Sequence, residues 1–321
     1  MKHSGQRGIA LLVAIVMFAI ATTVAAAITY NKAMAARRAA GMFTLEQALQ
    51  AGMAAEALAA IALEDDGKNS KTETNKPWAE PFGPVEIEGT GIWIQAQVED
   101  LTSRFNLNSL VKWDGPPNNG FIENKEQVQV FRKLLETLKI DPNYAELMVD
   151  WIDTNIAPQP TQGGEDTLYL TQTPPYRPPN TFIVHPSEIL AMPGFGATNY
   201  ALLAPFISAL PTDVKTNPCT ASGLVLDVTM NDPQNEQEFQ LQDMAALRKS
   251  GCANTTAAIV VNRIGDATLK ALAQARLDEK SSWFRLRTHI RIGTAEYVLY
   301  SVLFRQQNNR VRTVRRSFGS E

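Results

Sequence analysis

The sequence predicts an α+β fold in which one long N-terminal helix packs on a small antiparallel sheet, and a large helical domain interrupts that sheet. Residues 9–29 are apolar and uncharged, and no proline occurs before residue 77. Segments with strand periodicity lie far apart, at residues 92–98 and 284–304, and the stretch between them mostly has helical spacing. Because strands at both ends must pair, an insertion explains this order more simply than two successive domains.

The N-terminus combines a basic leader, residues 1–8, with the apolar run 9–29. This run is long enough to cross a bilayer, and Lys2 and Arg7 on its short side predict a cytoplasmic N-terminus. Three interpretations fit the segment: a cleaved secretory signal peptide, a permanent signal anchor, and a type IV prepilin leader cut between Gly8 and Ile9.

The residues after the apolar run favour the prepilin interpretation, because the helical pattern continues. Met42, Leu45, Leu49 and Met53 recur at helical spacing among Ala, Glu, Gln and Arg. We therefore predict a transmembrane helix over residues 9–29 and its amphipathic continuation over residues 30–63, roughly 80 Å in all. Val13, the fifth residue after the Gly8–Ile9 junction, stands where an acid is expected.

Composition limits the class of protein. The net charge of −3 gives no global nucleic-acid signature, although four arginines cluster near the C-terminus. The 321 residues leave room for one large or two modest domains beyond the helix. The chain has two cysteines, Cys219 and Cys252, which can form a disulfide outside the cytoplasm; two buried free thiols are the alternative.

The elements after the long helix follow from periodicity and breakers. Residues 64–84 are polar and contain Gly, Asn and Pro, so they form a linker. A half-buried strand follows at residues 92–98, and residues 284–292 and 297–304 form later strands. Helices are expected at residues 124–139, after Pro142, and at 187–192, 198–210, 237–250 and 266–275, with a Pro/Gly-rich loop over 157–180.

An acidic loop is the best candidate for chemistry. Asp150, Asp153 and Asn155 end one predicted helix, and the run Gly163-Gly164-Glu165-Asp166 follows. Converging oxygen donors suit Ca²⁺, although Pro158 at the sixth position from Asp153 excludes an EF-hand. The alternative is a solvated acidic turn that caps neighbouring helices.

Two other patterns have structural explanations beside functional ones. Residues 189–196 have the shape of a helix-hairpin-helix turn, but no Lys or Arg lies between Arg177 and Lys215, which favours a structural helix pair. Arg285, Arg287 and Arg291 could bind nucleic acid, lipid headgroups or an acidic partner, or be the wet face of a sheet. The histidines are scattered and no catalytic set emerges, so an enzyme is not expected.

Several segments together resemble the K-type minor pseudopilins of bacterial type II secretion systems, the general secretion pathway protein K family. The resemblance covers nearly the whole chain. It rests on the Gly8–Ile9 junction and on residues 103–108, 150–155, 163–166 with Tyr169, 175–177, 187–190 and 216–221.

The resemblance implies a type IV pilin-like fold with a helical domain inserted in its sheet. We place the pilin-like β region at residues 85–108 and 281–316, the inserted domain at 109–212 and a helical return segment at 213–280. It also implies bound calcium at Asp153, Asn155, Glu165 and Asp166. Asn155 stands where many relatives have an acid, which removes one charge from this site.

The implied function is structural. The chain would join the I-type and J-type minor pseudopilins, cap the pseudopilus, initiate its assembly and support export of folded proteins across the outer membrane. The resemblance also implies cleavage and methylation by prepilin peptidase, contact with the major pseudopilin, and a single pass through the inner membrane with the bulk of the chain periplasmic. Nucleic acid is not an expected partner.

Val13 acquires a meaning from this resemblance. In pilin packing an acid at the fifth mature position neutralises the α-amino group of a neighbouring subunit, and a subunit with nothing ahead of it needs no such acid.

Two other functions remain as alternatives to a pseudopilus subunit. One is a minor pilin of a type IV pilus or DNA-uptake system with a DNA-contacting arginine face, and the other is an anchored periplasmic enzyme that uses the acidic loop.

Overall fold

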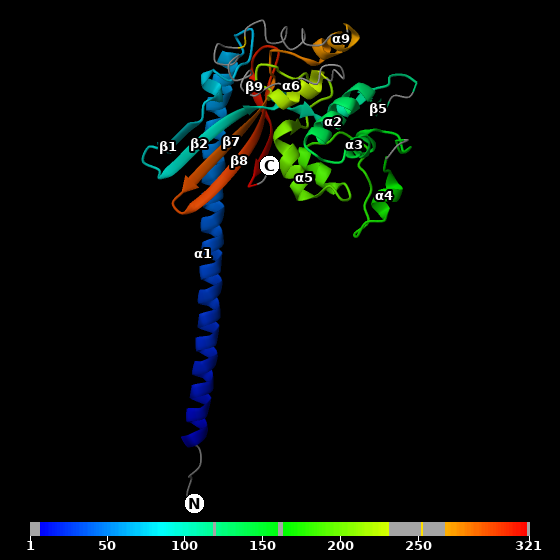
Figure 1. Cartoon of the computed structure of the whole chain (residues 1–321). Helices are drawn as coiled ribbons and strands as arrows, with labels where there is room; N and C mark the ends of the chain where they lie inside the picture. The colour runs from blue at the N-terminus through cyan, green and yellow to red at the C-terminus, as the bar shows by residue number, and fades with distance from the viewer. Residues whose placement is uncertain (1–6, 118–119, 160–162, 231–251, 253–266, 320–321) are drawn as a thin grey trace, which may run out of the picture.

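A computed structural model describes residues 7–117, 120–159, 163–230, 252 and 267–319. Helix α1 (Arg7–Asp66) is 60 residues long and leaves the globular part as a stalk that carries the N-terminus (Figure 1). At 1.5 Å per residue it measures about 90 Å. Its apolar part has a mean hydropathy of 2.7 and no buried residue, so it qualifies by length and composition as a membrane span.

The C-terminal part of α1 packs on a sheet through small residues. Ala48, Ala51, Ala55 and Ala59 recur at three and four residues, which places them on one helix face, and all four are buried. A Cβ added to Gly52 would lie 2.4 Å from Leu299 Cδ2. The helix backbone therefore approaches the sheet closely only because these side chains are small or absent.

The sheet is antiparallel, with the order β1-β2-β7-β8-β9. Its strands are β1 (Phe82–Ile87), β2 (Ile92–Asp100), β7 (Trp283–Ile292), β8 (Ala295–Arg305) and β9 (Val311–Phe318). The predicted strands at 92–98, 284–292 and 297–304 are confirmed, and β2 and β7 are neighbours although far apart in the sequence. The chain thus leaves the sheet at the end of β2, forms the inserted domain, and re-enters the sheet at β7.

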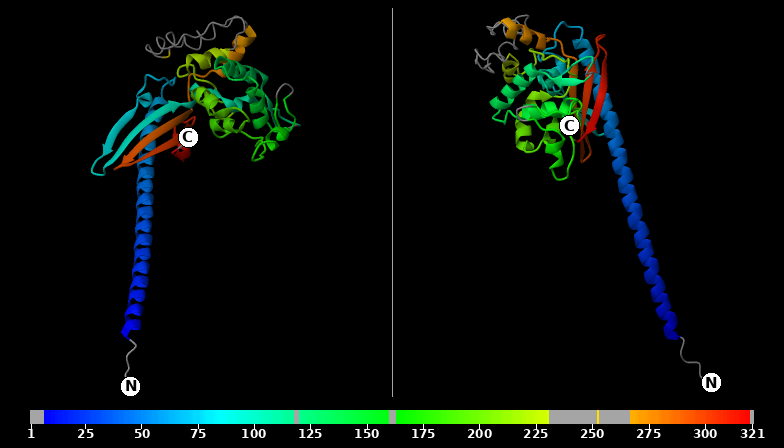
Figure 2. Two further views of the ribbon diagram at one scale, coloured as in Figure 1. Left: turned by 60° about the horizontal axis from the view of Figure 1, so that its bottom comes forward. Right: turned by 90° about the vertical axis from the view of Figure 1, so that its right-hand side faces the viewer.

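The two faces of the sheet differ as the alternation in β7 predicts. Phe284, Leu286 and Ile290 are buried on the α1 side, whereas Arg287 and Arg291 are exposed on the other side. Figure 2 shows α1 along one face of the sheet and the inserted domain beyond the other face. The molecule consequently has three layers above its stalk.

The inserted domain has its own hydrophobic core. Its elements are β3 (Phe105–Asn106), β4 (Val111–Trp113), β5 (Phe121–Glu123), α2 (Lys125–Thr137), α3 (Tyr144–Ile152), α4 (Asp166–Leu170), the 3₁₀ helix η4 (Pro186–Ala191), α5 (Gly196–Leu203), β6 (Ile207–Ser208), α6 (Gly223–Met230) and α9 (Ala267–Arg276). Large side chains dominate the core, among them Phe131, Leu134, Met148 and Tyr169.

The predicted boundaries differ from the structure at several points: α1 ends at Asp66 and not at residue 63, and β1 begins at Phe82, within the stretch 64–84 predicted as a linker. Residues 101–108 were assigned to the β region, but Phe105 and Leu107 belong to the core of the inserted domain. Val228, from the predicted return segment, belongs to the same core. Strand β2 therefore ends at Asp100 and β7 begins at Trp283, and buried apolar residues between Phe105 and Val228 form one core.

Two predicted helices need correction, and one lies outside the described residues. Residues 187–192 lie mostly in η4, and the helix expected at 198–210 ends at Leu203. After it, β6 pairs in parallel with β3, because Ile207 aligns with Phe105 and Ser208 with Asn106. Two-residue strands carry no measurable periodicity, so sequence patterns could not show this pairing. The helix expected at 237–250 lies outside the described residues.

Candidate functional sites: the acidic loop and the domain junction

The acidic loop brings three carboxylates into the interior of the inserted domain. Asp150 lies in the last turn of α3, Asp153 is the C-terminal cap of that helix, and Glu165 immediately precedes α4. Their exposed fractions are 0%, 0% and 6%, respectively. Fully buried carboxylates are rare unless they are paired or bind a cation, so this loop is more than a solvated turn.

Hydrogen bonds satisfy only part of this cluster. Asp150 Oδ2 accepts from the amide of Gly164 at 2.6 Å, and both Asp150 oxygens accept from the amide of Gln159 at 3.2 Å. Asn155 Nδ2 donates to Asp153 Oδ2 at 2.7 Å. Asp153 Oδ1 and Glu165 Oε1 are buried and have no hydrogen-bond partner among the described residues.

The electrostatics of the cluster are unfavourable without a cation. Burial and the charge of Asp150 raise the pKa of Asp153 to about 7, and burial with the neighbouring acids raises the pKa of Glu165 to about 7. Burial also raises the pKa of Asp150 to about 6. A bound cation would offset both the desolvation and the mutual repulsion, so the donor set fits a hard divalent ion.

The predicted ligand set is only partly brought together. Asp153 and Glu165 lie in the buried cluster, whereas the Asp166 side chain is 45% exposed and lies 3.4 Å from Arg177. Asn155 Oδ1 accepts from the amide of Ala157. Asp150, which sequence analysis noticed but left out of the ligand set, lies at the centre of the cluster.

The carboxylates of the acidic loop are farther apart than the ligands of one metal ion. Among the described residues, one group of three His, Cys, Asp or Glu ligand atoms lies within 4.8 Å of one another, namely Cys219, Cys252 and Glu279. The acidic loop forms no such group, so a cation there would draw its carboxylates closer or use additional oxygens. Gly163 keeps the loop tight, because a Cβ there would lie 2.3 Å from Asp150 Oδ2.

Cys219 and Cys252 are joined by a disulfide, with their Cα atoms 5.4 Å apart. Hydrogen bonds connect the bridge to the segment that follows α1, since the Cys252 amide donates to Glu73 and Lys71 donates to the Cys252 carbonyl. Bonded sulfurs are not thiolate ligands, so the group with Glu279 is not a metal site in this state.

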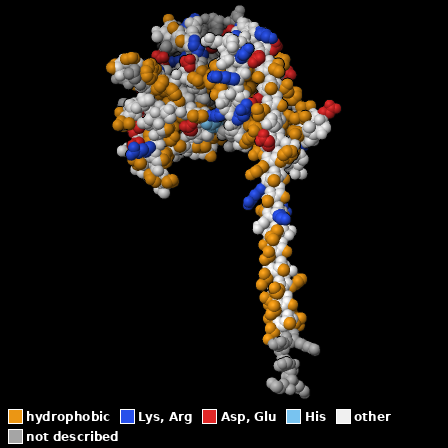
Figure 3. Space-filling view, turned by 180° about the vertical axis from the view of Figure 1, so that it is seen from behind, with side chains coloured by type: hydrophobic (Ala, Val, Ile, Leu, Met, Phe, Trp, Pro, Cys, Tyr) orange, Lys and Arg blue, Asp and Glu red, His pale blue; other side chains and the backbone are white. Residues whose placement is uncertain are grey.

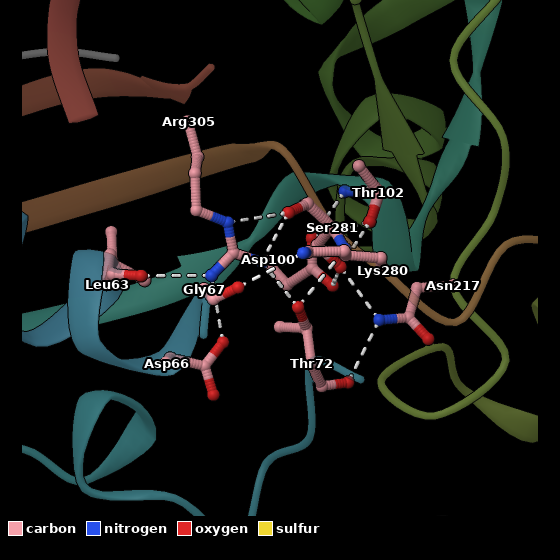
Figure 4. Close-up of polar contacts among 10 residues, drawn as sticks. All are labelled: Leu63, Asp66, Gly67, Thr72, Asp100, Thr102, Asn217, Lys280, Ser281 and Arg305. Carbon is pink, nitrogen blue, oxygen red and sulfur yellow. Dashed lines mark hydrogen bonds and ion pairs between the residues drawn. The ribbon is translucent and has the colours of Figure 1, made fainter. Parts of the chain in front are cut away.

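A polar junction joins α1, the sheet and the inserted domain (Figure 4). The buried Arg305 guanidinium contacts Asp66 at 2.9 Å, Thr72 at 2.6 Å and the carbonyls of Leu63 and Ser281. Sequence periodicity gave no signal for it, because Arg305 occupies an inward position of β8 that it shares with Leu299, Ser301 and Leu303.

The second half of the junction is centred on Asp100, at the last residue of β2. It accepts from the hydroxyls of Thr102, Thr220 and Ser281 at 2.5–2.7 Å. Asn217 donates to Ser281 Oγ and to the Thr72 carbonyl. Burial raises the pKa of Asp100, and the three hydroxyls and the Thr102 amide counteract that shift only in part. Both connections of the inserted domain are therefore fixed by hydrogen bonds.

The arginine face is divided between the two layers. Arg285 Nη2 lies 2.5 Å from Glu99 and is largely covered, whereas Arg287 and Arg291 are exposed and lie over the rings of Tyr300 and Trp93. Figure 3 shows the opposite, α1-side face of the molecule, where further Lys and Arg side chains lie beside α1. The wet-face interpretation thus holds for Arg287 and Arg291.

The helix-hairpin-helix-like turn is structural in this fold. Met192 and Phe195 are buried, and Gly194 has a φ of +80°, a conformation that favours glycine. The turn joins η4 to α5 within the domain core. The described residues that line the hollow at this turn, Tyr176, residues 190–194 and Gly196, include no cationic side chain that could meet a phosphate.

The N-terminal residues of interest lie at the free end of the stalk. Gly8 falls in the first turn of α1, and Ile9 and Val13 have exposed fractions of 66% and 48%. No described part of the chain packs against them. An exposed apolar surface of this extent is typical of segments that lipid or another protein covers.

Taken together, the stalk, the sheet and the insertion define a pilin-like protein with one N-terminal apolar helix and a helical domain between two central strands. A solved structure shares this fold: a chain of the crystal structure of the GspK-GspI-GspJ complex from the enterotoxigenic Escherichia coli type 2 secretion system. The match has a TM-score of 0.70 at 23% identity and covers 88% of this chain and 100% of that chain.

Sequence comparisons agree with this likeness in fold. Residues 103–212 match the family model described as type II secretion system protein K. Type II secretion system protein K of Pseudomonas aeruginosa is 28% identical over 98% of this chain and 93% of its own length. The protein of that name from Pectobacterium carotovorum is 29% identical over 99% and 98%. Over nearly its whole length the chain is thus similar to proteins named type II secretion system protein K, and residues 103–212 match the model of one domain of that protein.

Proposed function

We propose that this chain is the minor pseudopilin that caps the tip of a type II secretion pseudopilus. The observation that carries the proposal is the position of the inserted domain. It is inserted between the central strands β2 and β7 and lies beside the sheet, on the face away from α1 (Figures 1 and 2). A subunit added beyond it would have to share the space that this domain occupies.

The N-terminal helix supports the same position. Val13 replaces the acid that an internal subunit would offer to a neighbouring α-amino group, and a tip subunit has no such neighbour ahead of it. An unpaired charge within the membrane costs about 2.5–3.5 kcal/mol at the helix centre, so an apolar residue is the better choice there. The chain would be held in the inner membrane with its bulk in the periplasm.

The proposed partners are the I-type and J-type minor pseudopilins. The similar structure is named as a complex of three such proteins, and the same assembly is proposed for this chain. In this role the complex initiates assembly of the major pseudopilin and supports export of folded proteins. The role is structural and requires no catalytic step.

Position in the fibre can be tested directly. Pseudopili sheared from cells that overproduce the major subunit should carry an antibody label for this chain at one end only. Labels spaced along the shaft would contradict the tip assignment.

Substitution of Val13 is a second test of the tip position. Val13→Glu should lower secretion, while Val13→Leu should leave it unchanged. An unimpaired Val13→Glu variant would point to an internal subunit.

Processing can be tested by intact mass and N-terminal sequencing of the mature protein. A methylated N-terminus at Ile9 is the expected result. An N-terminus near Ile28 would restore the ordinary signal peptide and would overturn the proposal, because the membrane helix would then be absent from the mature chain.

We also propose that the acidic loop holds calcium, with Asp153 and Glu165 as ligands and Asp150 as a third carboxylate nearby. The unsatisfied buried oxygens of Asp153 and Glu165 support this proposal. The cation would connect the end of α3 to the start of α4. Its role is then structural, namely to neutralise a charge cluster inside the domain.

Thermal unfolding of the full chain tests the calcium site. Millimolar Ca²⁺ should raise Tm relative to chelator, because a ligand of the native state stabilises it by mass action. Asp153→Asn should abolish the calcium-induced shift, and the exposed Asp141→Asn should retain it. An identical Tm with and without Ca²⁺ would eliminate the site.

A DNA-contacting role is the competing function, and the exposed Arg287 and Arg291 are where it would act. Salt-dependent DNA binding that is lost in an Arg287→Ala/Arg291→Ala variant would favour a DNA-uptake pilin. Under the tip proposal, DNA binding should be weak and unchanged by these substitutions.

A further inference from the structure

A cavity of about 400 Å³ lies between the outer face of the sheet and the inserted domain. Trp283 and Val302 line it from the sheet, and Phe182, Tyr200 and Ile207 line it from the domain. Small-molecule sites have volumes of about 300–1,000 Å³ and occur preferentially at domain interfaces. The size and location of this cavity therefore fit a small ligand with an apolar body.

One side of the cavity is cationic. Arg104 Nη2 and Arg285 Nη2 lie 2.7 and 2.5 Å from the same oxygen, Glu99 Oε2. Arg315 Nη1 donates to the Val184 carbonyl at 2.5 Å. Within the described part of the chain, no carboxylate lies within 4.0 Å of the Arg315 guanidinium. The carboxylate of Glu99 is thus shared, and among the described residues Arg315 has a hydrogen bond to a carbonyl and Glu188 as the nearby acid that opposes the lowering of its pKa.

The surroundings of these arginines are electropositive and partly dry. Burial and the charge of Arg285 lower the pKa of Arg104. Burial, Arg315 and Arg285 together lower the pKa of His185, which also lines the cavity. A cation that is partly removed from water is costly unless an anion meets it, so a ligand carboxylate here would be stabilised strongly.

The main-chain groups around the cavity are already used, which argues against an extended peptide as ligand. Asn108 bonds the amide and carbonyl of Ile183 and the carbonyl of Leu210. Glu188 accepts from the amides of Val184 and His185. A bound peptide strand gains much of its affinity from such groups, whereas an aliphatic chain needs only apolar walls.

We propose that this interdomain cavity binds a free single-chain aliphatic monocarboxylate. Its carboxylate would lie at Arg315 and Arg104, and its chain would lie along Trp283, Val302 and Phe182. The ligand would contact both layers and so stabilise their relative orientation. This inference is independent of the tip assignment, because it depends only on the cavity and its charges.

The test uses the full chain in lipid nanodiscs and a brominated decanoate, which quenches tryptophan fluorescence on contact. We expect saturable quenching that disappears in Trp283→Phe. Brominated decanol, which has the same tail and no charge, should bind at least tenfold more weakly, since a charge-assisted pair is worth more than about 1.4 kcal/mol.

Three variants define the site. Arg315→Gln should weaken decanoate binding about tenfold and leave decanol binding unchanged. Arg312→Gln, on the same strand but over Phe304, should change neither, and Val302→Phe should reduce both by filling the cavity. Unaltered Tm values show that each variant is folded.

Several results would overturn the proposal. These are the absence of saturable quenching by decanoate, equal binding of decanoate and decanol, and equal effects of Arg312→Gln and Arg315→Gln. Displacement of decanoate by a hydrophobic pentapeptide at lower concentration would identify a chain terminus as the ligand instead. An empty nanodisc provides the baseline for partitioning of both probes.

Discussion

The core of the α1–sheet half and the core of the inserted domain are filled by side chains of different size. The sheet half buries alanines of α1 against Phe284, Leu299 and Leu303. The inserted domain buries large side chains against one another, including the stacked rings of Phe105 and Phe131. Small residues give a close helix–sheet contact, whereas large residues give a core that does not depend on a neighbouring layer.

The difference indicates how the two halves are joined. Each half has its own apolar core, and the connection between them is the polar junction of Arg305, Asp100, Ser281 and Asn217 (Figure 4). Hydrogen bonds are directional, so they fix an orientation that apolar contact alone would leave loose. The hydrogen bonds of the junction therefore fix the orientation of the inserted domain relative to the sheet.

Breaking the junction should have the largest effect. Arg305→Ala leaves Asp66 buried without its ion pair, so we expect a loss of about 3–5 kcal/mol in the free energy of unfolding. Arg312→Ala, an exposed arginine on β9, should change it by less than about 0.5 kcal/mol. Denaturant unfolding measures the free energy of unfolding of both variants. Equal changes in the two would mean that the junction contributes little to stability.

The independence of the two cores can be tested by a pair of truncations. Phe131→Ala should cost about 3–5 kcal/mol and Leu299→Ala about 2–5 kcal/mol. If the cores are separate, hydrogen exchange should accelerate mainly in the inserted domain for Phe131→Ala and mainly in the sheet for Leu299→Ala. Global acceleration by either variant would show one cooperative unit.

The close helix–sheet contact predicts a smaller, position-specific effect. Gly52→Ala introduces a Cβ 2.4 Å from Leu299 Cδ2 and should destabilise by about 1–3 kcal/mol. Gly41→Ala has open space and should stabilise by about 0.5–1 kcal/mol through helix propensity. The opposite signs are the test, and Tm shifts of the same sign for both would refute the close packing.

The acidic loop predicts a pH dependence confined to the inserted domain. Asp153 and Glu165 have folded-state pKa values of about 7, above their ordinary values, so the folded chain binds more protons between about pH 4 and 7. Without calcium, stability should fall as pH rises through this window. Calcium should remove the fall, and a Tm that rises with pH in chelator would contradict the assignment.

Much of the α1–sheet half could be predicted from the sequence. The uncharged run and the absence of proline predict the long helix, and the alternation at residues 92–98 and 284–292 predicts two strands with their inward faces. The terminal strand β9 was less evident, because its residues alternate between half-buried and exposed and none of them is fully buried. The fold class, α+β with an insertion, follows from the separation of the strands.

The candidate sites were only partly predictable. Residue types and the family resemblance pointed to Asp153, Glu165 and the neighbouring glycines. They could not show that Asp150 is central or that Asp166 faces Arg177, because burial is decided by how α3 and α4 pack. The same holds for Arg285, which sequence alternation placed on a wet face and the structure places largely under the inserted domain.

The sequence by itself determined the local structure: where the helix runs, which strand faces are apolar and where oxygen donors gather. Only the tertiary structure decided the long-range partners, such as Phe105 with Ile207 and Arg305 with Asp66. Local patterns report each residue's own burial and propensity. A polar contact between distant segments leaves no periodicity in either one, so it emerges only when the chain is folded.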